Sequence, residues 1–200
     1  MKLSKSRIAP DFAAIDVHGK EFKLSYHKGK KIVLSFFRNV GCPFCNRRVH
    51  QLMGMKLRPE DANTVVVCLF ESSNEKLRSS VMMDFVAPWP LVGNHEKNIY
   101  KMNGVEESFT KLLVSAFVAN AGQARTYINN LGIEHPKDPD SSNSLMPADF
   151  LIDEQFTIQH GHYGKHIDDH IDFNLIVKLL WECVERLWEV LIPKLCKRNR

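Results

Sequence analysis

The hydrophobic pattern of this chain alternates between short apolar runs and stretches with helical spacing. The runs 31–37 and 64–70 are apolar on both faces and rich in β-branched residues, as is typical of strands in the middle of a parallel sheet. The remaining elements predicted from the pattern are a hairpin over 12–24, short strands near 89–93 and 156–160, and helices over 44–57, 73–85 and 96–102. This alternation predicts a layered α/β domain.

Two further stretches carry helical patterns. Residues 106–145 contain apolar positions from Phe109 to Phe117 at helical spacing, which 124–131 continue, and a polar loop at 138–144. We expect a helical insertion that either covers a functional site or only adds bulk. A long helix is predicted from about 168 to 194, and its apolar surface is broad enough to pack on the sheet or to form a homodimer contact.

Composition limits the class of protein. The 200 residues are 44% hydrophobic, so residues 1–200 are expected to form one domain that needs no disulfide scaffold. The segment 1–7 lacks the apolar core of a secretory signal, which favours a reducing cytoplasm. The net charge of +4 lies partly in the C-terminal tail, for which a solvated end is favoured over contact with nucleic acid or a membrane. No apolar run is long enough to span a bilayer.

The most informative motif is Cys42-Pro43-Phe44-Cys45, which directly follows the apolar run 31–37. A cysteine that opens a helix after a strand lies at the positive end of the helix dipole, where the thiolate is favoured. We therefore expect the Cys42 sulfur to be exposed and ionised. Two cysteines three apart on the first turn share a face, and a disulfide closing so short a loop suits reversible exchange better than stabilisation. Thiol redox chemistry is therefore favoured over half of a zinc site, which would need a second ligand pair.

Other polar residues near the motif and elsewhere have two interpretations each. Arg38, Arg47 and Arg48 are close enough in sequence to stabilise a thiolate, or they are solvated surface charges. His162, His166 and His170 recur every fourth residue, but Gly161 and Gly164 argue against one helix. We therefore expect these histidines to be solvated and predict no metal site. Further expectations are a packing role for Cys68, an outward orientation for His50, and a bystander role for Cys183 and Cys196.

Four segments in this order resemble the alkyl hydroperoxide reductase/thiol-specific antioxidant (AhpC/TSA) family, the peroxiredoxins and their thioredoxin-fold relatives. The segments are Ala9-Pro10-Asp11-Phe12, the strand before Gly41-Cys42-Pro43-Phe44-Cys45, Trp89-Pro90-Leu91-Val92 with the following 98–105, and 146–153. The resemblance covers about two-thirds of the chain, with a break at 106–145. It implies an α/β thioredoxin-like fold, with a central mixed sheet flanked by helices.

The resemblance also implies roles for individual residues. Cys42 would be the attacking thiol and Cys45 its resolving partner, with Pro43 and Phe44 between them lining the substrate site. It implies that Pro147 is a cis-proline facing the site and that Met146 offers a backbone edge to a bound thiol substrate.

Two positions depart from the family pattern. Peroxiredoxins typically carry a proline and a threonine or serine seven and three residues before the attacking cysteine, where this chain has Ser35 and Asn39. Asn39 still offers a side-chain donor to a substrate. The family arginine that faces the cysteine has two candidates here, Arg38 and Arg125.

The functional prediction is a peroxiredoxin-like, thiol-dependent reductase of hydroperoxides that forms a Cys42 sulfenic acid and then a Cys42–Cys45 disulfide. Its partners would be a hydroperoxide or disulfide substrate and an external thiol reductant such as a thioredoxin-type protein. No cofactor is expected. Two alternatives stay open: a thioredoxin-like protein thiol-disulfide oxidoreductase, and a non-catalytic thioredoxin-fold binding module.

Overall fold

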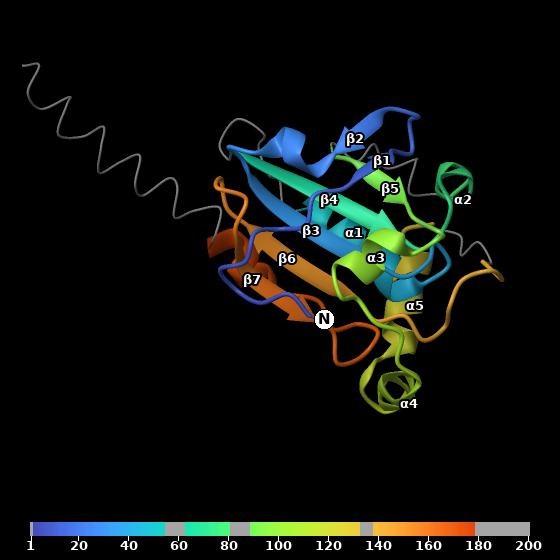
Figure 1. Cartoon of the computed structure of the whole chain (residues 1–200). Helices are drawn as coiled ribbons and strands as arrows, with labels where there is room; N and C mark the ends of the chain where they lie inside the picture. The colour runs from blue at the N-terminus through green and yellow to red at the C-terminus, as the bar shows by residue number, and fades with distance from the viewer. Residues whose placement is uncertain (1, 55–62, 81–88, 133–137, 179–200) are drawn as a thin grey trace, which may run out of the picture.

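A five-stranded mixed sheet forms the centre of the protein in the computed structural model, which describes residues 2–54, 63–80, 89–132 and 138–178. The strand order is β5-β4-β3-β6-β7 (Figure 1). Strands β5, β4 and β3 are mutually parallel, β6 runs antiparallel to β3, and β7 runs antiparallel to β6. The strands are β3 (Lys31–Phe37), β4 (Thr64–Phe70), β5 (Leu91–Gly93), β6 (Ala148–Ile152) and β7 (Ile158–Tyr163). The predicted bounds of β3 and β4 are confirmed.

Alternating residues of the central strand β3 feed two separate cores. Val33 and Phe37 point to one face of the sheet, where they pack with both cysteines of the Cys-x-x-Cys motif. Leu34 and Phe36 point to the other face and pack with Ile99 and other residues of α3. Because β3 is buried at all its positions, it needs apolar residues on both faces, and this explains its continuous apolar sequence.

Helices cover both faces of the sheet, with α1 (Pro43–Gly54) and α3 (Asn98–Met102) on opposite sides (Figure 1). The helix α5 (Ala121–Asn130) packs against α1 through the buried Ala124. The N-terminal hairpin of β1 (Ala13–Ile15) and β2 (Glu21–Lys23) is confirmed, and η1 (Leu24–His27) follows it. The remaining helices are α2 (Asn74–Arg78) and α4 (Phe109–Val118).

Two predicted helices differ from those observed. The insertion forms α4 and α5 rather than one continuous helix, because Asn120 starts α5 by accepting a hydrogen bond from Gln123 N at 2.9 Å. The helix expected over 73–85 begins as predicted, with Ser73 as its N-cap, but ends at Arg78. Residues 81–88 and the predicted end of α1 near 58 lie outside the described residues.

The C-terminal helix starts later than the sequence pattern predicts. Helical residues begin at 173 instead of 168. The segment before them contacts the sheet and α1 instead: Asp168 pairs with Arg47 at 2.5 Å, and Ile171 N donates to Asp149 at 2.9 Å. The rest of the predicted helix, with its dimer surface, Cys183, Cys196 and the basic tail, lies outside the described residues. Within the described residues, no helix has the length and apolar character to cross a membrane.

Candidate redox site at Cys42

Cys42 is the residue that precedes the first turn of α1, immediately after the loop that leaves β3. Its carbonyl oxygen accepts the first helical hydrogen bond from Asn46 N at 3.1 Å, and its own N–H donates to Asn39 O at 3.1 Å. Pro43 occupies the first helical position, where its missing N–H has no intrahelical partner to lose. The predicted placement of the motif at the start of a helix is confirmed.

The Cys42 thiol is tuned toward its ionised form. The pKa of Cys42 is lowered to about 6, first by a hydrogen bond from the Cys45 thiol, against the opposing effect of burial. The Arg38 charge and the backbone N–H groups of Cys45 and Phe44 lower it further. These amides belong to the first turn of α1, so the helix end itself stabilises the thiolate.

Cys45 is in the opposite state. Burial and the neighbouring charge of Cys42 raise the pKa of Cys45 well above its ordinary value. The pair therefore combines an ionised sulfur with a protonated one beside it, and both are free thiols. Such a pair supports nucleophilic attack by Cys42, while Cys45 keeps its proton until it is needed as the second nucleophile.

Arg38 is the cation that contacts Cys42. Its Nη1 lies 3.5 Å from Cys42 Sγ, and its Nη2 donates to Asn143 O at 2.7 Å. The side chain is buried, and among the described residues it has no ion pair with a carboxylate. The Cys42 thiolate is thus the negative charge that balances this buried cation.

The two arginines on α1 have a structural role instead. Arg47 pairs with Asp168, while Arg48 donates to Ile171 O at 2.5 Å and lies 3.7 Å above the Phe173 ring. Neither is among the groups that lower the pKa of Cys42. They hold the segment before the C-terminal helix against α1.

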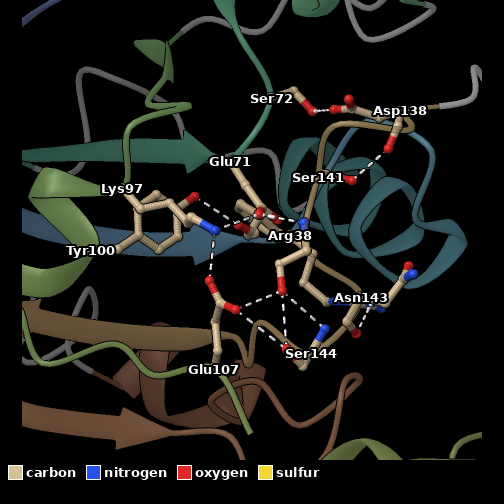
Figure 2. A network of polar contacts seen from close by, with 12 residues as sticks. Arg38, Glu71, Ser72, Lys97, Tyr100, Glu107, Asp138, Ser141, Asn143 and Ser144 are labelled. Carbon is tan, nitrogen blue, oxygen red and sulfur yellow. Dashed lines mark hydrogen bonds and ion pairs between the residues drawn. The ribbon is translucent and has the colours of Figure 1, made fainter. Parts of the chain in front are cut away.

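An exposed Cys42 thiol was expected, and this expectation is wrong. Cys42 is only 4% exposed, and Arg38 beside it is 7% exposed. Arg38 in turn donates to the backbone carbonyl of Asn143, in the loop 138–144 (Figure 2). This loop therefore reaches the site through Arg38.

The expected cis-proline is also wrong, because the described peptide bonds are all trans, including that of Pro147. Two backbone contacts tie this segment to its neighbours: Met146 N donates to Glu106 O at 3.0 Å, and Gly164 N donates to Pro147 O at 2.9 Å. The Met146 N–H that a bound substrate would use already has a partner. Met146 and Pro147 are both buried.

Among the remaining residues singled out from sequence, Asn39 adjoins Cys42 through its backbone. Arg125 is exposed on α5, and Asn39 is buried with its carbonyl bound to Cys42 N. The packing role predicted for Cys68 is consistent with its full burial, which raises its pKa. His50 is half-buried, and its Nδ1 lies 2.9 Å from Tyr127 Oη, so it does not point freely outward.

The histidines are not all solvated. His170 is buried and pairs with the fully buried Asp149 at 3.0 Å, and His162 pairs with Asp169 at 2.9 Å. The expectation of solvated histidines is therefore wrong for His170. Among the described residues, no group of histidines, cysteines and carboxylates is arranged to hold a metal ion.

The sequence analysis missed Glu71, which is 1% exposed at the end of β4 and accepts hydrogen bonds from Ser142 N at 2.6 Å and Lys97 Nζ at 3.3 Å. A charged residue directly after a buried apolar strand was the available signal.

A separate cavity of about 440 Å³ lies where β3 begins, away from Cys42. Its lining mixes basic and acidic side chains, including Lys31 and Asp153.

The mixed sheet, with a Cys-x-x-Cys pair at the start of the helix that follows its central strand, defines a thioredoxin-like fold. Solved structures of similar fold include a thiol peroxidase from Chromobacterium violaceum, with a TM-score of 0.61 and 16% identity over 91% of this chain and 88% of that one. A peroxiredoxin-like protein from Aquifex aeolicus has a TM-score of 0.64 and 11% identity over 91% and 88% of the two chains. A thiol:disulfide interchange protein, DsbE from Chlorobium tepidum, has a TM-score of 0.54 and 18% identity over 80% and 86%.

Residues 6–161 match the AhpC/TSA family, and the chain belongs to this family. The resemblance noted from the sequence motifs is thereby confirmed. A search among curated proteins gave no match. Family membership supports a thiol-dependent redox function.

Proposed function

We propose that the protein is a thiol-dependent peroxidase in which Cys42 is the attacking and Cys45 the resolving residue. The observation that carries this proposal is the opposite tuning of the two adjacent thiols, with a pKa of about 6 for Cys42 and a raised pKa for Cys45. At pH 7 roughly nine-tenths of Cys42 would be thiolate, compared with about one-hundredth for an ordinary thiol with a pKa of 9.0.

The first step is attack by the Cys42 thiolate on the terminal oxygen of a hydroperoxide. The O–O bond breaks, the alcohol or water leaves with a proton from solvent, and Cys42 becomes a sulfenic acid. The sulfur is oxidised by two electrons and the peroxide is reduced by two. Arg38 lies where it stabilises the thiolate before attack.

The second step is attack by Cys45 on the sulfenic sulfur, which releases water and forms the Cys42–Cys45 disulfide. The Cys45 proton leaves with the hydroxyl group as water. An external thiol reductant, which we propose to be a thioredoxin-type protein, then returns both residues to thiols by exchange. Pro43 and Phe44 lie between the two sulfurs and would border the approaching group.

Protein thiol-disulfide exchange is the second candidate function. The Cys-x-x-Cys spacing on one helical turn favours it, because Cys42 could attack a disulfide sulfur and Cys45 could displace the resulting mixed disulfide. The burial of Cys42 is the observation against it, since a folded protein substrate must bring its own sulfur into contact with the thiolate.

The test compares two activities of the same protein: peroxide consumption with a thioredoxin-type donor, and insulin reduction with dithiothreitol as the donor, from which the rate with dithiothreitol alone is subtracted. We expect hydrogen peroxide to be consumed and insulin disulfides to be left intact. Cys42→Ser should abolish turnover, and Cys45→Ser should accumulate a sulfenic acid on Cys42 that mass spectrometry detects. Cys68→Ala is the matched control, because Cys68 is a buried thiol outside the pair. Insulin reduction without peroxide consumption would favour the second candidate.

A non-catalytic binding module would give a third result. Cys42 would then react with iodoacetamide slowly, with a pH midpoint near that of an ordinary thiol. That outcome would contradict both redox proposals.

A further inference from the structure

The loop 138–144, called here the strap, is attached at several points to the residues around Cys42 (Figure 2). Asn143 O accepts from Arg38 Nη2 at 2.7 Å, and Ser142 N donates to Glu71 Oε1 at 2.6 Å. At its start, Asp138 accepts from Ser72 Oγ. These contacts reach residues that directly follow the two central strands of the sheet.

The attachment points are buried and charged, which makes them strong. Glu71 is a buried carboxylate, and its contact with the strap is a charge-assisted hydrogen bond. Lys97 joins Glu71 to Glu107 at 3.3 and 2.6 Å, and Glu107 in turn accepts from Ser142 Oγ at 2.9 Å. The strap is therefore held by a connected network rather than by one contact.

Arg38 connects this network to the reactive sulfur. One end of its guanidinium contacts Cys42 Sγ and the other end donates to the strap. The position of the strap and the charge on Cys42 therefore act on the same side chain. When the sulfur is oxidised to a disulfide, its negative charge is lost, and Arg38 loses one of its two contacts.

We propose that the strap closes over the reduced Cys42, so that small hydroperoxides reach the sulfur and protein disulfides do not, and that disulfide formation loosens the strap for the thiol reductant. This proposal rests on the proposed peroxidase function and names its substrate class. A hydroperoxide needs only to bring one oxygen to the sulfur. A protein disulfide must align its S–S bond with the attacking thiolate, which a sulfur that is 4% exposed does not permit.

The first experiment measures how fast reduced Cys42 reacts with two maleimides, one small and one carrying a long polyethylene glycol chain. Mass spectrometry of the Cys42 peptide gives the labelling rate for each reagent. In Ser142→Pro the strap lacks the N–H that Glu71 binds. We expect the ratio of large-reagent to small-reagent rates to rise by roughly tenfold or more, as the loss of a charge-assisted hydrogen bond predicts. Asp138→Ala, which frees the start of the strap, should raise the ratio in the same direction.

Asn143→Ala is the matched control. The exposed Asn143 side chain is removed, but the backbone carbonyl that binds Arg38 remains. Its labelling ratio should equal that of the wild type. If neither Ser142→Pro nor Asp138→Ala changes the ratio, the strap does not limit access, and the proposal is overturned. Because labelling requires no turnover, this result is independent of whether the protein consumes peroxide.

The second experiment compares hydrogen exchange of the strap amides in the reduced protein and after formation of the disulfide with diamide. The amides of Ser142 and Ser144, which both have acceptors in the reduced structure, should exchange about tenfold or more faster after oxidation. Equal protection in both states would contradict the redox link. The double variant Cys42→Ser/Cys45→Ser, which has no thiol in the pair for diamide to attack, should show no change with diamide.

Discussion

Replacing Arg38 by methionine should raise the pKa of Cys42 by about one to two units. The guanidinium nitrogen lies 3.5 Å from the sulfur, where two unit charges attract by about 5 kcal/mol at an effective dielectric constant of 20. This is an upper limit, because the positive charge is spread over the guanidinium and water would enter in its place. A rise from about 6 to about 7 or 8 would lower the thiolate fraction at pH 7 from about nine-tenths to between a half and a tenth.

The assay is the pH dependence of Cys42 alkylation by iodoacetamide, read on the Cys42 peptide. Because only the thiolate reacts, the midpoint of the rate gives the pKa directly. Arg38→Lys separates charge from geometry, since it keeps the positive charge but not the two-ended contact with sulfur and strap. We expect its midpoint to fall between those of the wild type and Arg38→Met.

Arg47→Met is the matched control, since it removes an arginine of α1 whose ion-pair partner is Asp168 and not the sulfur. Its midpoint should stay at the wild-type value. The reasoning is refuted if Arg38→Met leaves the midpoint near 6 while the protein remains folded by circular dichroism. An equal upward shift in Arg47→Met would likewise show that the contact with Arg38 is not the cause.

Three other changes have defined outcomes. Cys45→Ala should raise the pKa of Cys42, because the hydrogen bond from Cys45 is the largest of its causes; alkylation rates against pH measure the shift. Burial by itself would raise the pKa of Asp149, but the charge of His170 and a hydrogen bond lower it to about 2. Wild type should therefore lose about 2 kcal/mol of stability as the pH falls from about 4 to 2, and denaturation should show a smaller loss for Asp149→Asn. Gly93→Ala would place a Cβ 2.5 Å from Asn74 N, so its melting temperature should fall, by a stability loss of about 1–3 kcal/mol.

Much of the fold and the position of the reactive pair could be predicted from local pattern. The strand bounds 31–37 and 64–70 matched because buried parallel strands need apolar residues on both faces. The helix expected from about 44 begins one residue earlier, at Pro43, which suits the first helical position. Arg38 was named as a candidate because it stands four residues before Cys42, a separation that a short loop can bridge.

Two of the differences depend on contacts between residues far apart in the chain. Arg38, the cation beside Cys42, is bound by Asn143 about a hundred residues later, and Cys42 packs in a core that includes Val17 and Phe37. The late start of the C-terminal helix has a similar origin, since Asp149 and Arg47 hold the residues that would have formed its first turn. No local spacing encodes such pairings.

The sequence by itself determined the order of strands and helices and the chemistry at the start of α1, because periodicity and helix-end preferences act over a few neighbouring residues. Only the tertiary structure decided how accessible that chemistry is. Glu71, Arg38 and the strap are far apart in the sequence, and their hydrogen bonds form only when the chain folds.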